Sequence, residues 1–196
     1  MQIDWNRLDR QNSIAVLERI TTSTDPSLFS ATSSEAQFKA LPFYQNFMLY
    51  RVINYATLPS FSLEFLSDGE SFHLLDGSAD PISNVNAQGS LYLNENNVTD
   101  YVAFYLSNVM AEDGDIYMIK DPDDLPFMDS LSLDQQFELK SRHTPAQVAV
   151  DQTTGDFIVL ADLFYGGTLL KAAITVNTSG DIHIQPRDML MSAQYV

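Results

Sequence analysis

The residues with the clearest chemical potential are an arginine and the aromatic side chains near it. Arg51 lies in the middle of an apolar segment, in a chain with only ten basic residues. A buried guanidinium needs a carboxylate, a ring or a ligand beside it, because burying it unpaired costs roughly 3–5 kcal/mol. We therefore predict that Arg51 lies at the rim of a pocket for an anionic ligand, beside Tyr55, Phe72 and His73. The alternative is an internal ion pair with Glu64.

A second group of charged residues lies between residues 112 and 134. This stretch holds eight acidic residues against one lysine, a net charge of −7. Charge at this density either keeps the chain soluble or attracts a basic partner. The sequence around Gly114 lacks the spacing of a calcium-binding loop, so we predict no metal site. The acidic interaction surface that we predict consists of Glu112, Asp113, Asp115, Asp121, Asp123 and Asp124.

The charge of the whole chain excludes several classes of partner. Its 26 acidic and 10 basic residues give a net charge of −16 and a pI near 4.2. Such a chain repels nucleic-acid phosphates and anionic membranes, and its strongest apolar run, residues 101–110, is half of the roughly 20 residues that a membrane span needs. We expect a basic protein partner or a small ligand. With no cysteine and no recognisable leader, we expect a cytoplasmic, bacterial protein.

Few patterns in the sequence favour catalysis. The spacing of Glu70 and His73 resembles that of a carboxylate-bridged metal site on a helix, but these residues fall in a predicted strand, where they would face opposite ways. The nucleophile and phosphate-loop motifs that we sought are absent from the sequence, and we predict no catalytic residue and no cofactor. The carboxylates of Glu64, Glu70, Asp76 and Asp80 leave a small carboxylate-based hydrolase as an alternative.

Helical periodicity identifies the elements that position these residues. Residues 96–110 carry apolar side chains at helical spacing and predict one principal amphipathic helix that packs on a sheet. Shorter helices are predicted at residues 12–21 and 34–41, the second from a Ser-x-x-Gln capping pattern. The same pattern at Ser132 predicts a helix that ends near residue 142. The Ser/Thr-rich passage between the first two helices has the composition of a linker.

Alternation with a period of two predicts strands along the rest of the chain. Asp68-Gly69 predicts a tight reversal between two of them. The last fifty residues predict a four-strand antiparallel meander whose central strands are apolar on both faces. A helix, or a second copy in a homodimer formed through this C-terminal sheet, would cover the second face. The strands are predicted at residues 48–55, 61–65, 72–74, 81–85, 90–93, 116–119, 147–151, 156–165, 168–177 and 181–185.

Together these patterns predict an α+β fold with a mainly antiparallel, curved sheet. We expect residues 1–42 to form an N-terminal helical segment, packed on or tethered to a single α+β domain of residues 43–196. For function we favour a non-catalytic, acidic binding or protein-interaction domain. The alternatives are the carboxylate hydrolase, and a nucleic-acid mimic or immunity-type inhibitor of a basic partner.

Overall fold

The computed structural model describes residues 5–21, 23–111, 114, 116–125 and 127–191 of the chain. The protein has the predicted α+β fold, and its sheets are antiparallel as expected. The strands form two sheets, whereas the sequence predicts one curved sheet. The chain divides into two compact units, residues 1–92 and 93–196. The boundary expected at residue 42 falls inside the first unit, between two strands that pair with each other.

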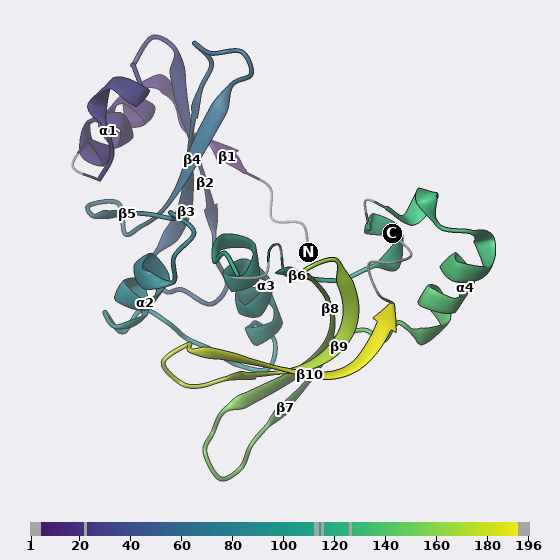
Figure 1. Ribbon diagram of the computed structural model, residues 1–196. Helices are drawn as coiled ribbons and strands as arrows, with labels where there is room; N and C mark the ends of the chain where they lie inside the picture. Colours follow the sequence, from purple (N-terminus) through teal and green to yellow (C-terminus); the bar gives the residue numbers. More distant parts are fainter. Residues whose placement is uncertain (1–4, 22, 112–113, 115, 126, 192–196) are drawn as a thin grey trace. The chain divides into compact units, whose positions relative to one another are not determined.

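The first unit is built on a five-stranded antiparallel sheet (Figure 1). Its strands follow the order of the sequence, so each one pairs with the next along the chain. The strands are β1 (Asn6–Arg7), β2 (Ser34–Ala40), β3 (Met48–Asn54), β4 (Phe61–Ser67) and β5 (Phe72–Leu74). The alternating pattern that predicted β3, β4 and β5 is therefore confirmed.

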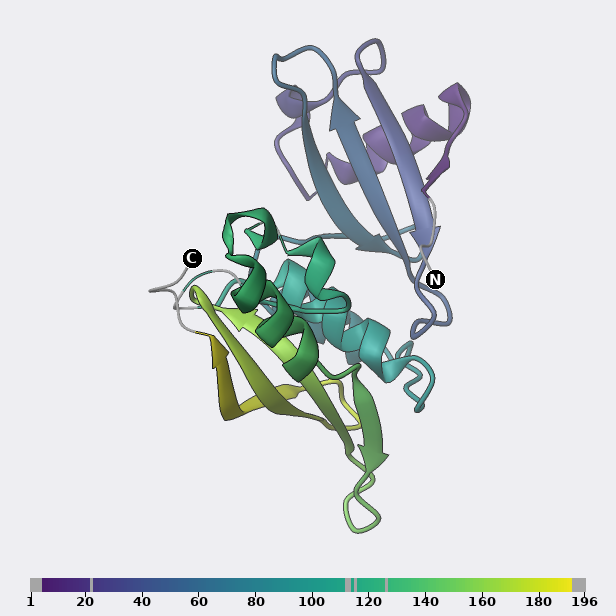
Figure 2. The ribbon, with the colours of Figure 1, turned by 90° about the vertical axis from the view of Figure 1, so that its right-hand side faces the viewer.

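Helix α1 (Arg10–Ile20) covers one face of this sheet (Figure 2), which confirms the predicted first helix. Asp9 caps it by accepting a hydrogen bond from the backbone N–H of Asn12 at 2.8 Å. The buried side chains on its inner face pack against the sheet and against one another, and burying each one contributes roughly 1.5–3 kcal/mol. This core comprises Val16, Leu17, Ile20, Ala36, Val52, Phe65 and Phe72.

Three sequence-based assignments up to residue 93 were wrong. In place of the strand predicted at residues 90–93, the structure has an isolated bridge between Leu91 and Tyr44. The helix predicted at residues 34–41 is strand β2. Burial alternates with a period of two at its start, because Ser34 and Ala36 are buried while Glu35 and Gln37 are more exposed. The strand predicted at residues 81–85 is helix α2 (Asp80–Asn86). Proline suits the first turn of a helix, and the buried Ile82 and Val85 are three residues apart, as one helix face requires.

A carboxylate organises the reversal between β4 and β5. Asp68 accepts hydrogen bonds from the backbone N–H groups of Glu70 (2.9 Å) and Ser71 (2.8 Å), and Gly69 takes a positive φ of 94° that favours glycine. The N–H of Ser71 is the largest cause of a lowered pKa at Asp68. The predicted reversal is confirmed, with a connection of residues 68–71 in place of a two-residue turn.

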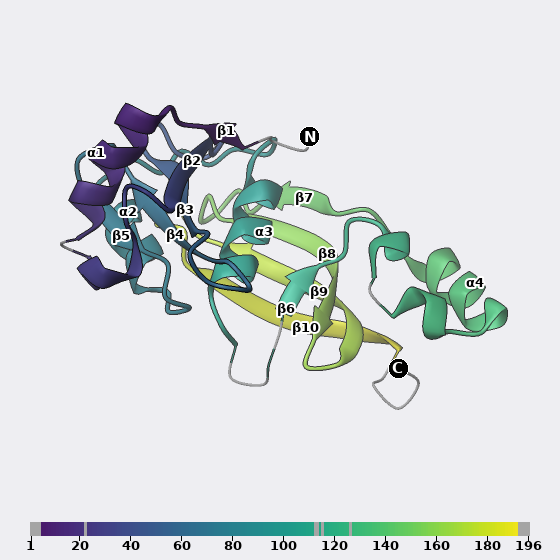
Figure 3. The same cartoon turned by 90° about the horizontal axis from the view of Figure 1, so that it is seen from above.

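The second unit contains the principal helix, α3 (Val98–Asn108), which lies against a second antiparallel sheet (Figure 3). The buried Tyr101 of this helix donates a hydrogen bond to the carbonyl of Gly180 at 2.7 Å. Both the helix and the four-strand meander are confirmed, and β6 adds to the same sheet. Its strands are β6 (Ile116–Met118), β7 (Gln147–Val150), β8 (Phe157–Tyr165), β9 (Thr168–Val176) and β10 (Ile182–Met191).

Helix α4 (Leu133–Arg142) begins at Ser132 with the predicted capping box. It follows two 3-10 turns, Pro122–Asp124 and Met128–Ser130, and shares with them a cluster of buried apolar side chains that includes residues of β9 and β10. Arg142 donates hydrogen bonds to the carbonyls of Leu190 (3.0 Å) and Met189 (2.9 Å), which attaches the end of α4 to β10. Among the described residues, no helix has the length and apolar character to cross a membrane.

Candidate functional site

Arg51 forms the internal pair that the sequence offered as the alternative. Its Nε and Nη2 donate to Oε1 of Glu64 at 2.8 and 2.5 Å, and the two residues are direct cross-strand partners on β3 and β4. The guanidinium also lies 4.1 Å from the centre of the Trp5 ring. Both requirements of the cation, an anionic acceptor and a π face, are met inside the fold.

Lys39 completes this cluster on β2. Its ammonium lies 4.7 Å from the centre of the Trp5 ring. Burial lowers the pKa of Lys39, and the positive charge of Arg51 lowers it further, whereas Glu64 acts in the opposite direction. The charged groups on this face of the sheet therefore have partners within the fold. This indicates a structural role for the cluster of Trp5, Lys39, Arg51 and Glu64.

The four residues predicted to line one ligand pocket do not come together. Phe72 packs in the α1 core, on the opposite face of the sheet from Arg51. His73 lies on β5 beside Phe47, with ring centres 6.0 Å apart, and its Nε2 is buried without a hydrogen-bond partner among the described residues. Tyr55 follows β3 and lines a different pocket, described below. Alternation along strands and the separation of β3 from β5 explain this dispersal.

The predicted acidic surface is only partly described. Glu112, Asp113 and Asp115 lie outside the described residues. Asp121 caps a 3-10 turn by accepting from the N–H of Asp123 at 3.0 Å, and the Asp123 carboxylate pairs with Lys140 of α4 at 2.5 Å. Asp124 is exposed. Two of the three described carboxylates thus have local structural roles.

Two of the four carboxylates considered for hydrolysis, those of Glu64 and Asp76, have local partners, and Glu70 is exposed. Asp76 accepts from the N–H and the hydroxyl of Ser78 at 2.9 and 2.7 Å, Glu64 holds Arg51, and Asp80 occupies the first turn of α2. Within the described ranges there is no group of three or more His, Asp or Glu side chains placed to hold a metal ion.

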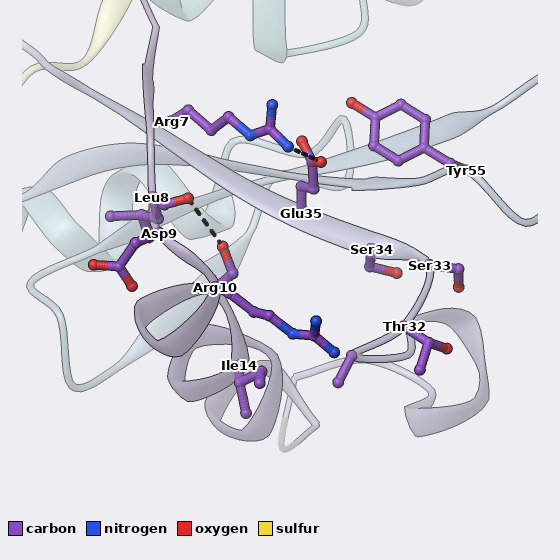
Figure 4. Close-up of a pocket in the computed structure, with 12 residues that line it drawn as sticks. Arg7, Leu8, Asp9, Arg10, Ile14, Thr32, Ser33, Ser34, Glu35 and Tyr55 are labelled. Carbon is purple, nitrogen blue, oxygen red and sulfur yellow. Dashed lines mark hydrogen bonds and ion pairs between the residues drawn. The ribbon is translucent and has the colours of Figure 1, made fainter.

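A pocket of the first unit lies between the start of α1 and the start of β2 (Figure 4). Its volume is about 650 Å³, within the range of ~300–1,000 Å³ that is typical of small-molecule sites. We call it the Arg10 pocket. Its lining residues are Arg7, Leu8, Asp9, Arg10, Ser13, Ile14, Ala31, Thr32, Ser33, Ser34, Glu35 and Tyr55.

Backbone pairing fixes the base of the Arg10 pocket. The N–H of Leu8 donates to the carbonyl of Ala36 at 3.0 Å, which holds the segment before α1 against β2. The hydroxyl of the buried Ser13 donates to the Leu8 carbonyl at 3.5 Å and accepts from the N–H of Ala36 at 3.4 Å. Ser13 of α1 is therefore hydrogen-bonded both to the segment before the helix and to strand β2.

Hydroxyl groups form the opposite wall. The Ser30 hydroxyl lies 2.7 Å from that of Ser33 and 3.2 Å from that of Thr32, and the backbone N–H of Tyr55 donates to the Ser33 carbonyl at 2.9 Å. Tyr55 is 53% exposed. Its side chain stands at the edge of the pocket (Figure 4), so a ligand there would meet several groups that can both donate and accept hydrogen bonds.

The two arginines of the pocket differ in their electrostatic surroundings. Arg7 forms an ion pair with Glu35, and both oxygens of Asp9 accept hydrogen bonds from Asn12. The Arg10 side chain extends toward the turn that carries Thr32 (Figure 4). Within the described residues no carboxylate pairs with Arg10. Among the described residues, the guanidinium of Arg10 is therefore the one in this pocket that forms no ion pair.

Comparison of the chain with models of protein families, with curated proteins and with solved structures gave no match. The argument for function thus depends on the geometry of the sites.

Sequence reasoning missed most of the Arg10 pocket. The sequence predicts a ligand-binding role for Tyr55, but no pattern in it identifies Arg10, and the Ser/Thr-rich passage that ends at residue 34 has the composition of a linker. The available signal was that this passage ends in hydroxyl residues, directly before a strand. Only the pairing of β1 with β2 places these hydroxyls opposite the start of α1.

Proposed function

We propose that the protein is a non-catalytic binding protein, and that its first unit takes a small hydroxylated oxyanion in the Arg10 pocket. The proposed ligands are sugar acids and sugar phosphates. The observation that carries this proposal is the guanidinium of Arg10, which pairs with no carboxylate of the described residues and lies in a hydroxyl-lined pocket. The pocket supplies no nucleophile with an adjacent base, which favours binding over catalysis.

The ligand class follows from the two kinds of group that line the pocket. A guanidinium presents N–H donors in a planar fork that matches a carboxylate or a phosphate. Ser33, Thr32 and Tyr55 offer hydroxyls, which pair well with the hydroxyls of a sugar. In a chain with a net charge of −16, an unpaired cation also gives an anion a local point of attraction.

Calorimetric titration with glucuronate, glucose 6-phosphate and neutral glucose tests this function. We expect the two anions to bind and glucose to bind more weakly, and we expect Arg10→Gln to weaken anion binding at least tenfold. A hydrogen bond to a charged group is worth ~1.5–3 kcal/mol, and each 1.4 kcal/mol is a factor of about ten. Added salt should weaken binding as well.

Lys120→Gln is the matched control, because it removes one positive charge at an exposed position of the second unit and leaves the Arg10 pocket unchanged. It should bind both anions like the wild-type protein. Equal binding of glucose and the anions, or equal weakening by both substitutions, would contradict a specific role of Arg10.

A further inference from the structure

We propose a second binding site in the second unit, for an aliphatic monocarboxylate. The site is a cavity of about 260 Å³ between the segment that joins α4 to β7 and the strands β8, β9 and β10. We call it the Arg187 cavity. This inference is independent of the Arg10 pocket, because it concerns other residues and a different, more apolar ligand.

A buried carboxylate organises one side of the cavity. Asp162 of β8 is only 2% exposed, and its Oδ2 lies 2.8 Å from Nδ1 of His143 and 3.1 Å from the backbone N of Thr144. These contacts hold the start of the α4–β7 segment over the sheet. A buried carboxylate with several donors is a fixed, satisfied group, so Asp162 serves as the scaffold of the site.

Asp162 in turn positions a cation. Nζ of Lys171, the direct cross-strand partner of Asp162 on β9, lies 3.8 Å from Oδ1 of the carboxylate. The same Nζ donates a hydrogen bond to the Thr144 hydroxyl at 2.8 Å. An ammonium has three N–H donors, and the side chain of Lys171 is 33% exposed. Asp162 and Thr144 therefore fix the position of the Lys171 ammonium, which still has an N–H group that can donate to a ligand.

Arg187 provides a second cation, and the register of β10 explains where it lies. Pro186 pairs with Ala172 and Asp188 with Lys171, so Arg187 is the extra residue of a β-bulge. Bulges change the direction of a side chain, and this one lines the cavity. The neighbouring Asp188 pairs with Arg142 at 3.3 Å, and no described residue forms an ion pair or hydrogen bond with Arg187.

The charges of the cavity do not cancel. Lys171 and Arg187 contribute two positive charges and Asp162 one negative charge, so the lining carries a net positive charge in a chain of net −16. The remaining wall is mainly apolar and includes Pro145, Leu160 and Ala172. A ligand that fits has one anionic group for the cations and an aliphatic part for this wall.

The volume indicates how much of a ligand the lining residues can surround. At ~30 Å³ for each water-sized group, the cavity holds roughly nine such groups, which suits a short-chain carboxylate better than a sugar phosphate or a nucleotide. The carboxylate could belong to a free short-chain acid or to the C-terminus of a peptide that ends in an aliphatic residue. The chemistry of recognition is the same for both.

Titration of the full-length protein with hexanoate, followed by the backbone amide signals of Leu160 and Ala172, tests the site. We expect these signals to shift with hexanoate and to shift little with hexanol, which lacks the charge. A dipeptide ending in leucine, compared with its C-terminal amide, shows whether a peptide carboxylate binds in the same way. We expect Arg187→Gln to raise the Kd for hexanoate about tenfold or more.

Two substitutions serve as controls for this titration. Arg10→Gln should leave hexanoate binding unchanged, so failure of the Arg10 pocket and failure of this site give different results. Leu160→Ser, on a side chain already 45% exposed, should weaken hexanoate without unfolding the protein. If hexanoate causes no shifts, if hexanol binds equally well, or if Arg187→Gln binds like the wild type, the proposed site is wrong.

Discussion

Arg51 and Arg10 lie in the same unit, but their guanidinium groups differ in the partners that the surrounding residues provide. Arg51 has a carboxylate at hydrogen-bond distance and a tryptophan ring beneath it. Arg10 lies in a hydroxyl-lined pocket, and the nearby carboxylates of Glu35 and Asp9 are engaged by Arg7 and Asn12.

The contrast separates a structural arginine from one available to a ligand. A guanidinium whose partners belong to the fold contributes to stability, and its removal leaves its carboxylate partner unpaired. A guanidinium without a partner contributes little to folding and keeps its full capacity for an external anion. The predictions below test this distinction, beginning with the side of the comparison where stability should change most.

The largest effect should come from removing the carboxylate that neutralises Arg51. Glu64→Ala should lower the free energy of unfolding by about 2 kcal/mol, measured by urea denaturation. Buried pairs lose ~3–5 kcal/mol when one partner is removed, whereas fully exposed pairs are worth ~0–1 kcal/mol. The side chains of this pair are 34% and 25% exposed, which places it between these limits.

Glu70→Ala is the matched control for that experiment, since Glu70 is exposed and lies in the same unit. It should change the free energy of unfolding by less than about 0.5 kcal/mol. If both substitutions have the same small effect, Arg51 is not held by Glu64 in solution.

Removal of the ring beneath Arg51 should have a smaller effect. Trp5→Ala should lower the free energy of unfolding by about 1 kcal/mol, because cation–π contacts with Lys39 and Arg51 are each worth ~0.5–1 kcal/mol at partly exposed sites. Trp5→Phe should retain part of this stability. An unchanged urea midpoint in Trp5→Ala would show that the ring does not contribute.

The turn carboxylate Asp68 should show the smallest effect, and one that depends on pH. Its folded pKa is lowered from the ordinary value of 3.8, chiefly by the Ser71 N–H, so its contribution is present above that value and is lost as pH falls through the folded pKa. Asp68→Ala should cost less than about 1 kcal/mol at neutral pH, after allowance for solvent screening.

Urea denaturation across a pH series checks the prediction for Asp68. The difference between the wild type and Asp68→Ala should shrink as the pH is lowered below 4. A difference that stays constant into strong acid would mean that the side chain acts through packing and not through its charge.

Local chemistry made much of the fold predictable. The apolar spacing of α3, the capping box at Ser132 and the glycine turns of the last fifty residues act within a few residues, and the structure has these elements where they were predicted. The errors came where local patterns were ambiguous. Ser34 and Gln37 fit a capping box, but their segment pairs with strands on both sides and forms β2.

The sites were less predictable than the fold because they depend on register and on contacts distant in the chain. The pair of Arg51 and Glu64 was foreseeable from two neighbouring strands, and the sequence offered it as an alternative. The bulge that leaves Arg187 unpaired and the pairing that places Thr32 opposite Arg10 have no local signature. Such features require knowledge of which strands meet, and at which residues.

A parallel study of Arg10→Gln and Arg51→Gln tests the central claim most directly, with glucuronate titration and thermal denaturation applied to both variants. We predict that Arg10→Gln loses glucuronate binding at an unchanged Tm, while Arg51→Gln has a lower Tm and binds glucuronate like the wild type below its transition. The opposite pattern, with binding lost in Arg51→Gln and stability lost in Arg10→Gln, would contradict the assignment of the two arginines.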